Sequence, residues 1–227
     1  MQQVSGCKAC SRDKRGEYAL RRTCILLRHG QTPGNEKRCY LGCRTDEDLT
    51  EEAVRIGRKQ CTGLRASLSG SAAVCASPMK RTLVTASFLA ESEEILVVDE
   101  LKEMDFGPFE GKTYEELKDR LGYRTWIESG GEETIPGVEK KTDFIRRSMA
   151  GFRKALMRSL PQKDLFVVCH GGTIMAVMSE LTGGDYFSFP AEHFGGYRLE
   201  LEQEDERIHL LSYDRLCGRL CSGSSDR

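Results

Sequence analysis

Two apolar runs in this sequence each end in a histidine that is followed by glycine. In the first, Arg28 and His29 come directly after Cys-Ile-Leu-Leu, and in the second, His170 and Gly171 come after Leu-Phe-Val-Val-Cys. An arginine presents a planar fork of donors that suits phosphate, and a histidine can act as nucleophile, general base or metal ligand. Such residues at the ends of buried segments indicate a site for a phosphate-like anion.

The residues after the first histidine add further donors. Gly30 lets the backbone approach a ligand closely, and the stretch from Gln31 through Thr32 to Asn35 supplies amides and polar side chains for an anion pocket. On its own, this stretch fits equally well an arginine paired with a surface carboxylate beside an ordinary histidine. The second run decides between the two, because an apolar helical pattern follows His170, Gly171 and Gly172, and helix N-termini bind anions.

Two further strand-to-helix junctions add an arginine and a carboxylate. Arg81 lies one turn into a helical pattern, and Glu103 follows a fourth apolar run. The set is rich in groups that neutralise an anion and poor in metal ligands, so we expect no metal and no cofactor. A carboxyl group beside a scissile bond can donate a proton to the leaving oxygen, and Asp105 and Glu110 are the nearest rivals of Glu103 for that role.

Apolar runs and amphipathic stretches alternate along the chain and must position these side chains. We predict strands at residues 24–27, 73–76, 95–98 and 165–169, and a sheet-edge strand at 196–201. We predict helices at residues 50–68, 80–89, 114–121, 141–160 and 173–181. Continuously apolar strands that alternate with helices indicate an α/β fold, a three-layer sandwich with a mostly parallel central sheet and helices on both faces. Ligands bind at the carboxyl ends of such strands, where both histidines lie.

The two ends of the chain differ from this middle part. Residues 1–22 are polar and aperiodic and are predicted to form a loose extension, whereas residues 215–227 form a flexible tail rich in Ser and Gly. We therefore predict one domain, residues 23–214.

The composition argues against several classes of protein. The 34 basic and 35 acidic residues give a formal charge of −1, and the basic residues lack interleaved aromatics, which argues against a nucleic-acid partner. No apolar run approaches the ~20 residues that cross a bilayer, and the N-terminal stretch lacks the apolar centre of a secretory signal. We expect a cytoplasmic protein with no membrane partner.

Ten cysteines are many for a cytoplasmic protein. Cys24, Cys75 and Cys169 lie inside apolar runs, where a free thiol packs as a small hydrophobe, and we expect Cys169 to face the core. Four more have a spacing that supplies zinc ligands if the termini meet: Cys7, Cys10, Cys217 and Cys221. The second of these spacings is loose and no histidine completes either pair, so we favour reduced, unpaired thiols.

Four motifs occur in a fixed order along the chain. They are Arg-His-Gly-x-Thr-x-x-Asn from Arg28, Ser-Pro-x-x-Arg-x-x-x-Thr-Ala from Ser77, Leu-x-Glu-x-x-x-Gly-x-x-Glu-Gly from Leu101, and His-Gly-Gly from His170. Each motif alone is weak, but the ordered set is specific. Over residues 23–200 it resembles the histidine phosphatase superfamily, which is also called phosphoglycerate-mutase-like.

This resemblance implies a role for each residue. His29 would be the nucleophile that takes the phosphoryl group, and Glu103 would be the proton donor to the leaving oxygen and then the base for water. A protonated His170 would donate to the phosphoryl oxygens together with Arg28 and Arg81. The residues that complete the pocket would be Gln31, Thr32, Asn35 and Gly171.

The chain departs from the family in two places. Where the family usually has Gly-Gly-Glu-Ser, this chain has Gly137-Val138-Glu139-Lys140. Val138 replaces the second glycine and Lys140 the serine, so we expect no catalytic role for Glu139. Cofactor-dependent phosphoglycerate mutases carry a long insertion that covers the site, whereas here only a short segment separates Gly111 from Glu139. An open site favours water as the acceptor. The stretch FGPFEGKTYEEL from Phe106 and the later Trp126 and Ile-Pro-Gly from Ile135 resemble small bacterial phosphatases, which include α-ribazole-phosphate phosphatase of cobalamin synthesis.

We therefore predict a metal-independent phosphomonoesterase that acts on a small phosphorylated metabolite, such as α-ribazole phosphate, through a phosphohistidine. Two alternatives stay open: a cofactor-dependent phosphoglycerate mutase, and a catalytically silent protein that binds a phosphorylated ligand. The complete set of site residues argues against the second alternative. The sequence also leaves a homodimer open.

Overall fold

The computed structural model describes residues 10–12, 18–68, 71–90, 94–160, 163–204 and 207–218. Within these ranges, seven strands form one sheet in the order β4-β3-β5-β2-β6-β7, and β1 pairs with β2. The strands are β1 (Cys10–Arg12), β2 (Tyr18–Arg28), β3 (Ala72–Ala76), β4 (Leu96–Val97), β5 (Asp164–Cys169), β6 (Gly196–Glu204) and β7 (Arg207–Leu216). The four strands from β4 to β2 are parallel, whereas β1, β6 and β7 pair antiparallel, so the sheet is mixed.

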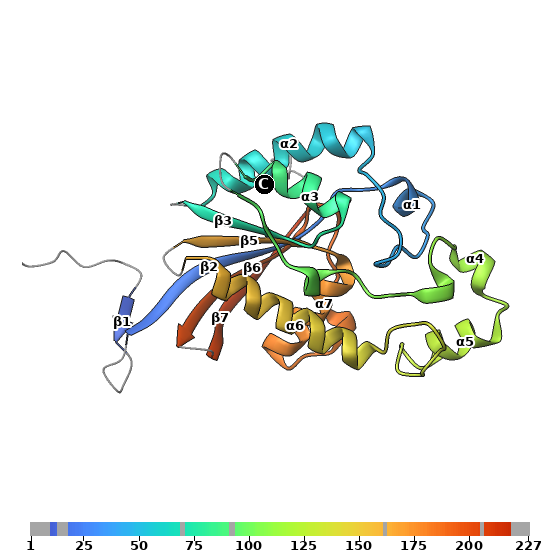
Figure 1. Cartoon of the computed structure of the whole chain (residues 1–227). Coiled ribbons are helices and arrows are strands. Elements are labelled where there is room, and N and C mark those ends of the chain that lie inside the picture. Colours follow the sequence, from blue (N-terminus) through green and yellow to red (C-terminus); the bar gives the residue numbers. More distant parts are fainter. Residues whose placement is uncertain are drawn as a thin grey trace, which may run out of the picture.

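Helices cover both faces of this sheet (Figure 1). Helices α2 (Glu51–Ala66) and α3 (Lys80–Ser87) lie on one face, and α6 (Lys141–Arg158) and α7 (Gly171–Thr182) lie on the other. This arrangement confirms the predicted α/β sandwich. Three short helices lie beyond the carboxyl ends of the parallel strands: α1 (Pro33–Glu36), α4 (Tyr114–Leu117) and α5 (Leu121–Glu128). None of the helices in the described ranges is long and apolar enough to span a bilayer.

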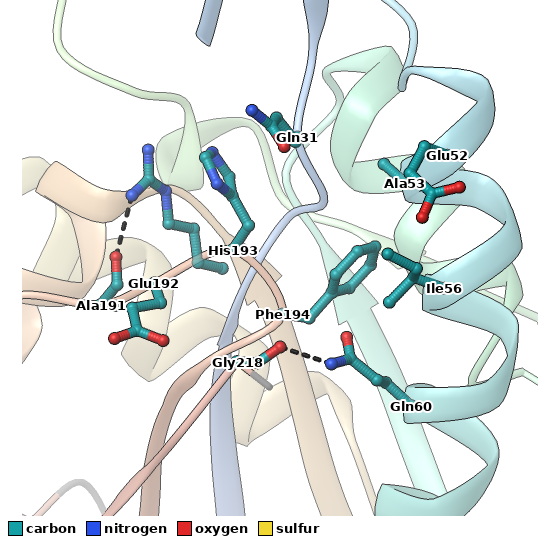
Figure 2. Close-up of a pocket in the computed structure, with 11 residues that line it drawn as sticks. Gln31, Glu52, Ala53, Ile56, Gln60, Ala191, Glu192, His193, Phe194 and Gly218 are labelled. Carbon is teal, nitrogen blue, oxygen red and sulfur yellow. Dashed lines mark hydrogen bonds between the residues drawn. The ribbon is translucent and has the colours of Figure 1, made fainter. Parts of the chain in front are cut away.

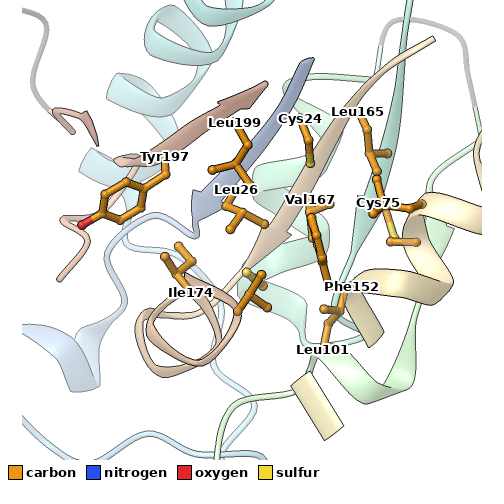
Figure 3. Close-up of a cluster of buried hydrophobic side chains, with 14 of the residues drawn as sticks. Cys24, Leu26, Cys75, Leu101, Phe152, Leu165, Val167, Ile174, Tyr197 and Leu199 are labelled. Atoms are coloured by element: carbon orange, nitrogen blue, oxygen red, sulfur yellow. The ribbon is translucent and has the colours of Figure 1, made fainter. Parts of the chain in front are cut away.

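The parallel strands are apolar throughout because both of their faces are buried. Along β2, Cys24 and Leu26 pack in a core cluster under α6 and α7, while Ile25 and Leu27 belong to the cluster under α2 and α3. Figure 3 shows the first cluster, in which Leu26 lies near Ile174 of α7. The two packed faces fix the register of β2, and this register places Arg28 and His29 at the end of the strand.

More of the N-terminal and C-terminal parts of the chain belongs to the sheet than the sequence predicts. Strand β2 begins at Tyr18, so residues 18–22 belong to the sheet and not to a loose extension. Arg22 is 5% exposed, and its guanidinium donates to the Leu156 carbonyl at 2.7 Å and to Ser159 Oγ at 2.9 Å. A hydrophobic pattern does not show a strand whose charged side chains find partners on a neighbouring helix.

The C-terminal part of the sheet also differs from the prediction. Strand β6 is not an edge, because β7 pairs along its outer side and continues to Leu216, inside the predicted tail. Most of β7 is exposed, so its sequence lacks a buried apolar run. The predicted helix 114–121 is two helices, α4 and α5, with Arg120 in an extended conformation between them.

The cysteines are partly described. Within the described residues Cys24, Cys75 and Cys169 are free and buried, and Cys169 packs in the core cluster under α7, as predicted. Of the four terminal cysteines, Cys217 is free and exposed. Cys7, Cys221 and the side chain of Cys10 lie outside the described part, so zinc binding there stays a prediction.

Candidate active site

The imidazole of His29 lies at the carboxyl end of β2 and is 4% exposed. Its backbone amide donates to the Cys169 carbonyl at 3.0 Å, which extends the pairing of β2 with β5 by one residue. Its Nδ1 lies 2.6 Å from the Gly30 carbonyl oxygen, so Nδ1 carries the ring proton and Nε2 keeps a lone pair. Burial, followed by the charges of Arg81 and Arg28, holds the pKa of His29 well below its ordinary value. The ring is therefore neutral at pH 7.

A second buried imidazole, that of His170, lies beside the first. The ring centroids of His29 and His170 are 5.2 Å apart. Nδ1 of His170 accepts from Arg81 Nε at 3.3 Å, and its Nε2 lies 2.9 Å from Ser77 Oγ. Burial and then the charge of Arg81 lower the pKa of His170 far below its ordinary value. Burial and the neighbouring guanidinium both disfavour the protonated form, and the neutral ring accepts the hydrogen bond from Arg81, so the role of His170 as a protonated donor stays a prediction.

Two guanidiniums, one partly and one fully buried, supply the positive charge of the site. Arg81 is fully buried, and it donates to the carbonyls of Thr45 at 2.7 Å and Gly42 at 3.0 Å. Arg28 donates to the Ala191 carbonyl at 2.9 Å, while its buried Nε has no partner among the described residues. Burial lowers the pKa of each guanidinium, but both stay charged in a protein. Backbone carbonyls thus fix two cations at the strand ends.

The carboxyl group of Glu103 lies at the N-terminus of α7. Oε1 accepts from the amide of Met104 and Oε2 from the amide of Gly172, both at 2.9 Å. A Cβ at Gly172 would lie 2.3 Å from Oε1, so only glycine allows this approach. Burial raises the pKa of Glu103, against the opposing effects of the two amides and of Arg81 and Arg28. A carboxyl group with a raised pKa can hold a proton that it later donates.

Arg147 fixes the backbone that carries Glu103. Its guanidinium donates to the carbonyls of Glu100 and Lys102 at 2.9 Å and forms two hydrogen bonds with Glu139, at 2.8 and 2.9 Å. Glu139 therefore holds the arginine that holds this segment. This geometry agrees with the expectation that Glu139 is not catalytic itself.

Thr32 and Asn35 form the N-terminal cap of α1. Thr32 Oγ1 accepts from the Asn35 amide at 3.3 Å, and Asn35 Oδ1 accepts from the Thr32 amide at 3.2 Å. Asn35 Oδ1 also lies 3.1 Å from Nε2 of His193, whose ring centroid is 5.9 Å from that of His29. The sequence analysis missed His193, because it lies in a loop before β6 with no apolar run or motif to indicate it.

Two openings lie around Arg28. A cavity of about 280 Å³ contains His29, Asn35, Glu103 and Gly171. An outer depression of about 680 Å³ shares Arg28 and Ala191 with this cavity. It is also lined by Gln31, His193 and Phe194 (Figure 2). Of the residues predicted to bind the phosphoryl group, Gln31 thus lines the outer depression, while Asn35 and Gly171 line the cavity of His29.

One group in the described part of the chain could hold a metal ion, namely Cys43, Asp105 and Glu110. The sequence analysis found no cluster of carboxylates, because these residues converge only in the fold. Arg44 already engages both carboxylates: its guanidinium pairs with Asp105 at 2.7 Å, and its amide donates to Glu110 at 3.1 Å. Neither Asp105 nor Glu110 is among the residues that line the cavity of His29.

Phosphoryl transfer needs a nucleophile, fixed positive charges and a group that can donate a proton. The strand ends of this α/β sandwich bring together a buried imidazole nitrogen, two fixed guanidiniums and a carboxyl group that can be protonated. The histidine phosphatase superfamily (branch 1) matches residues 24–214, and the chain belongs to this family.

The chain is similar to proteins with different names. The chain is 34% identical over 163 residues to a bifunctional protein of Mycobacterium tuberculosis, and the match covers 70% of this chain but only 41% of that protein. It is 29% identical over 202 residues to phosphoserine phosphatase 1 of Hydrogenobacter thermophilus, covering 85% of this chain and 92% of that one. The crystal structure of the α-ribazole phosphatase of Shigella flexneri has the same fold, with a TM-score of 0.70 at 22% identity, over 90% of this chain and 100% of that chain.

Proposed function

We propose that this protein is a metal-independent phosphomonoesterase that hydrolyses a small phosphorylated metabolite through a phosphohistidine. The observation that carries the proposal is the hydrogen bond of 2.6 Å between Nδ1 of His29 and the Gly30 carbonyl, which leaves Nε2 as the nucleophile. Arg28 and Arg81 lie close enough to depress the pKa of this ring, and they would meet the charge of a phosphoryl group.

In the first step, Nε2 of His29 attacks phosphorus, and a P–N bond forms as the bond to the leaving oxygen breaks. The leaving oxygen takes its proton from the carboxyl group of Glu103, whose pKa burial raises. Glu103 ends this step as a carboxylate that accepts hydrogen bonds from the amides of Met104 and Gly172.

In the second step, a water molecule attacks phosphorus, its proton passes to the Glu103 carboxylate, and the P–N bond breaks. Inorganic phosphate leaves, and His29 returns to its neutral form. Arg28 and Arg81 supply the positive charge that Mg²⁺ supplies in kinases. A bound phosphoryl group would oppose these charges and raise the pKa of His170 again, which would restore the donor role that the sequence analysis gives it.

Two features support hydrolysis over mutase chemistry. The segment between Gly111 and Glu139 contains only the short helices α4 and α5. It is shorter than the insertion that covers the site in cofactor-dependent phosphoglycerate mutases. Two of the three similar proteins named above are phosphatases, one of phosphoserine and one of α-ribazole phosphate, and both compounds are candidate substrates.

The test is hydrolysis of p-nitrophenyl phosphate in the presence of EDTA. We expect turnover by the natural protein, an acid-labile phosphate on His29 in quenched samples, and a loss of at least about 10⁴-fold in His29→Ala. Activity that EDTA abolishes and a divalent ion restores would contradict the proposal, as would substantial activity in His29→Ala. A requirement for 2,3-bisphosphoglycerate in a coupled assay would instead support the phosphoglycerate mutase. Binding of a phosphorylated ligand without turnover would support the catalytically silent protein.

A further inference from the structure

A second cavity, of about 250 Å³, adjoins the cavity of His29 on the side of Glu103. The two share Glu103, Gly172 and Met175 among their walls. The other walls of the second cavity come mainly from α5, the start of α6 and the turn Tyr186–Ser188. Because the proton donor lies between the two cavities, the group that it protonates leaves phosphorus toward the second one.

Aromatic rings form most of the outer walls of this cavity. Phe106 and Trp126 meet edge to face, with centroids 6.0 Å apart and planes at 85°. Tyr186 and Phe187 form a second such pair, at 5.0 Å and 89°. Rings prefer this geometry for one another, and a further ring can add to it in the same way. The cavity thus has the walls that suit a flat apolar group.

The polar groups on these walls already have partners. Lys141 donates to the Gly130 carbonyl at 2.9 Å and forms an ion pair with Glu132. Its Nζ also lies 5.8 and 5.4 Å from the ring centroids of Tyr186 and Phe187. Because Glu132 matches the charge of Lys141, this cation is not free to bind a carboxylate on the ligand. A charged leaving group would lose its hydration here and would gain no ion pair to compensate for that loss.

We propose that this cavity binds the leaving group, and that the natural substrate is a phosphate monoester whose alcohol carries an aromatic ring. The proposal rests on the proposed function and adds the class of substrate. An apolar cavity of about 150 Å³ is enough for benzene, so a volume of about 250 Å³ accepts a substituted ring. Phosphoserine, whose leaving group carries an ammonium and a carboxylate, fits these walls poorly.

The first experiment compares 2-phenylethyl phosphate with ethyl phosphate. Their alkoxides are similar leaving groups, so the ring is the main difference between them. We expect kcat/KM of the natural protein to be about 30-fold higher for the phenylethyl ester, and phosphoserine to be as poor as ethyl phosphate or poorer.

The matched variants are Phe187→Ala and Tyr114→Ala. Both side chains are aromatic and 56% exposed, but only Phe187 lines the cavity. Phe187→Ala should lower kcat/KM for 2-phenylethyl phosphate about tenfold and leave that for ethyl phosphate unchanged, whereas Tyr114→Ala should change neither.

A second measurement does not depend on turnover. Trp126 is the only tryptophan of the chain, and it lines the cavity, so its fluorescence reports on ligands there. In His29→Ala, which leaves the ester intact, 2-phenylethyl phosphate should change the emission of Trp126, and ethyl phosphate at the same concentration should not.

The outcomes separate the two proposals. Equal kcat/KM for the two esters, or an equal loss for both in Phe187→Ala, would overturn the aromatic subsite and leave the phosphatase standing. Absence of hydrolysis of both esters and of p-nitrophenyl phosphate would overturn the phosphatase, while the emission of Trp126 would still decide whether the cavity binds a ring. No response of Trp126 to 2-phenylethyl phosphate would overturn the subsite.

Discussion

The two sides of Glu103 are built in different ways. On the side of His29, charged groups sit at the ends of central strands, and carbonyls such as those of Gly42 and Thr45 fix their positions. On the other side, rings from short helices and turns enclose a volume, and they rest on a separate small core cluster that includes Phe109 and Leu117. Transfer of a phosphoryl group needs charges at fixed points, whereas selection of an alcohol needs only shape and polarity. The sheet therefore carries the requirement common to all substrates, and the segment around α4 and α5 carries the choice among them.

The largest effect should come from Arg81 and should be the same for every substrate. Arg81→Met removes one of two fixed charges, and we expect kcat/KM to fall about 10³- to 10⁵-fold for aryl and alkyl phosphates alike. Steady-state kinetics on both kinds of ester measure this. Because Arg81 is buried, Arg81→Lys is the companion variant that keeps a charge, and circular dichroism confirms its fold. If the loss of kcat/KM in Arg81→Met depended strongly on the alcohol of the ester, the separation between phosphoryl transfer on one side of Glu103 and selection of the alcohol on the other would be wrong.

Glu103 lies on the boundary, so its effect should depend on the basicity of the leaving group. Glu103→Gln cannot donate a proton, and we expect the rate for an alkyl phosphate to fall about 10²- to 10⁴-fold. The rate of phosphorylation by p-nitrophenyl phosphate should fall far less, because p-nitrophenolate leaves without a proton. The controls are Asp105→Asn and Glu110→Gln, whose carboxylates are engaged by Arg44. If one of these controls shows the dependence instead, that residue is the acid.

A smaller effect concerns stability at low pH. Burial is the main cause that lowers the pKa of His29, His170 and His193, in the last case to about 4. Below about pH 6.5, these histidines bind protons in the unfolded chain but stay neutral in the folded chain. Proton binding therefore favours the unfolded state, and the free energy of unfolding decreases as the pH falls below about 6.5. The urea midpoint should therefore decrease between pH 7 and pH 5.

A matched pair of variants tests the origin of that decrease. His193→Gln should show a smaller decrease in urea midpoint than the natural protein, because one of the three imidazoles with a lowered pKa is gone. His209→Gln, which changes an exposed histidine of β7, should show the same decrease as the natural protein. Equal decreases in all three proteins would exclude His193 as a contributor.

The smallest effect on catalysis should be at Cys169, although this residue adjoins His170. Its side chain packs in the core cluster under α6 and α7, and Cys169 is not among the residues that line the cavity of His29. Cys169→Ser should keep kcat/KM within about twofold, while the buried hydroxyl lowers the free energy of unfolding by about 1–3 kcal/mol. A folded variant without activity would show that the thiol takes part in the chemistry.

The same division explains what the sequence could predict. The strands that end in His29 and His170 were predictable, because strands buried on both faces leave continuous apolar runs. The exposed β7 leaves no such run. His193 and Phe187 lie in connecting segments, and their positions depend on packing between parts that are distant in sequence. The lowered pKa of His170 comes from its burial and then from the charge of Arg81, and no sequence pattern shows either.

The contact between His29 and its own neighbour has one more consequence. An imidazole has two nitrogens, and a phosphorylated histidine therefore exists as two chemical isomers. Since Nδ1 is occupied by its proton and the Gly30 carbonyl at 2.6 Å, the backbone itself selects the isomer. The adduct should be 3-phosphohistidine alone, with phosphorus on Nε2, and an antibody specific for that isomer should recognise the trapped protein where one raised against 1-phosphohistidine does not.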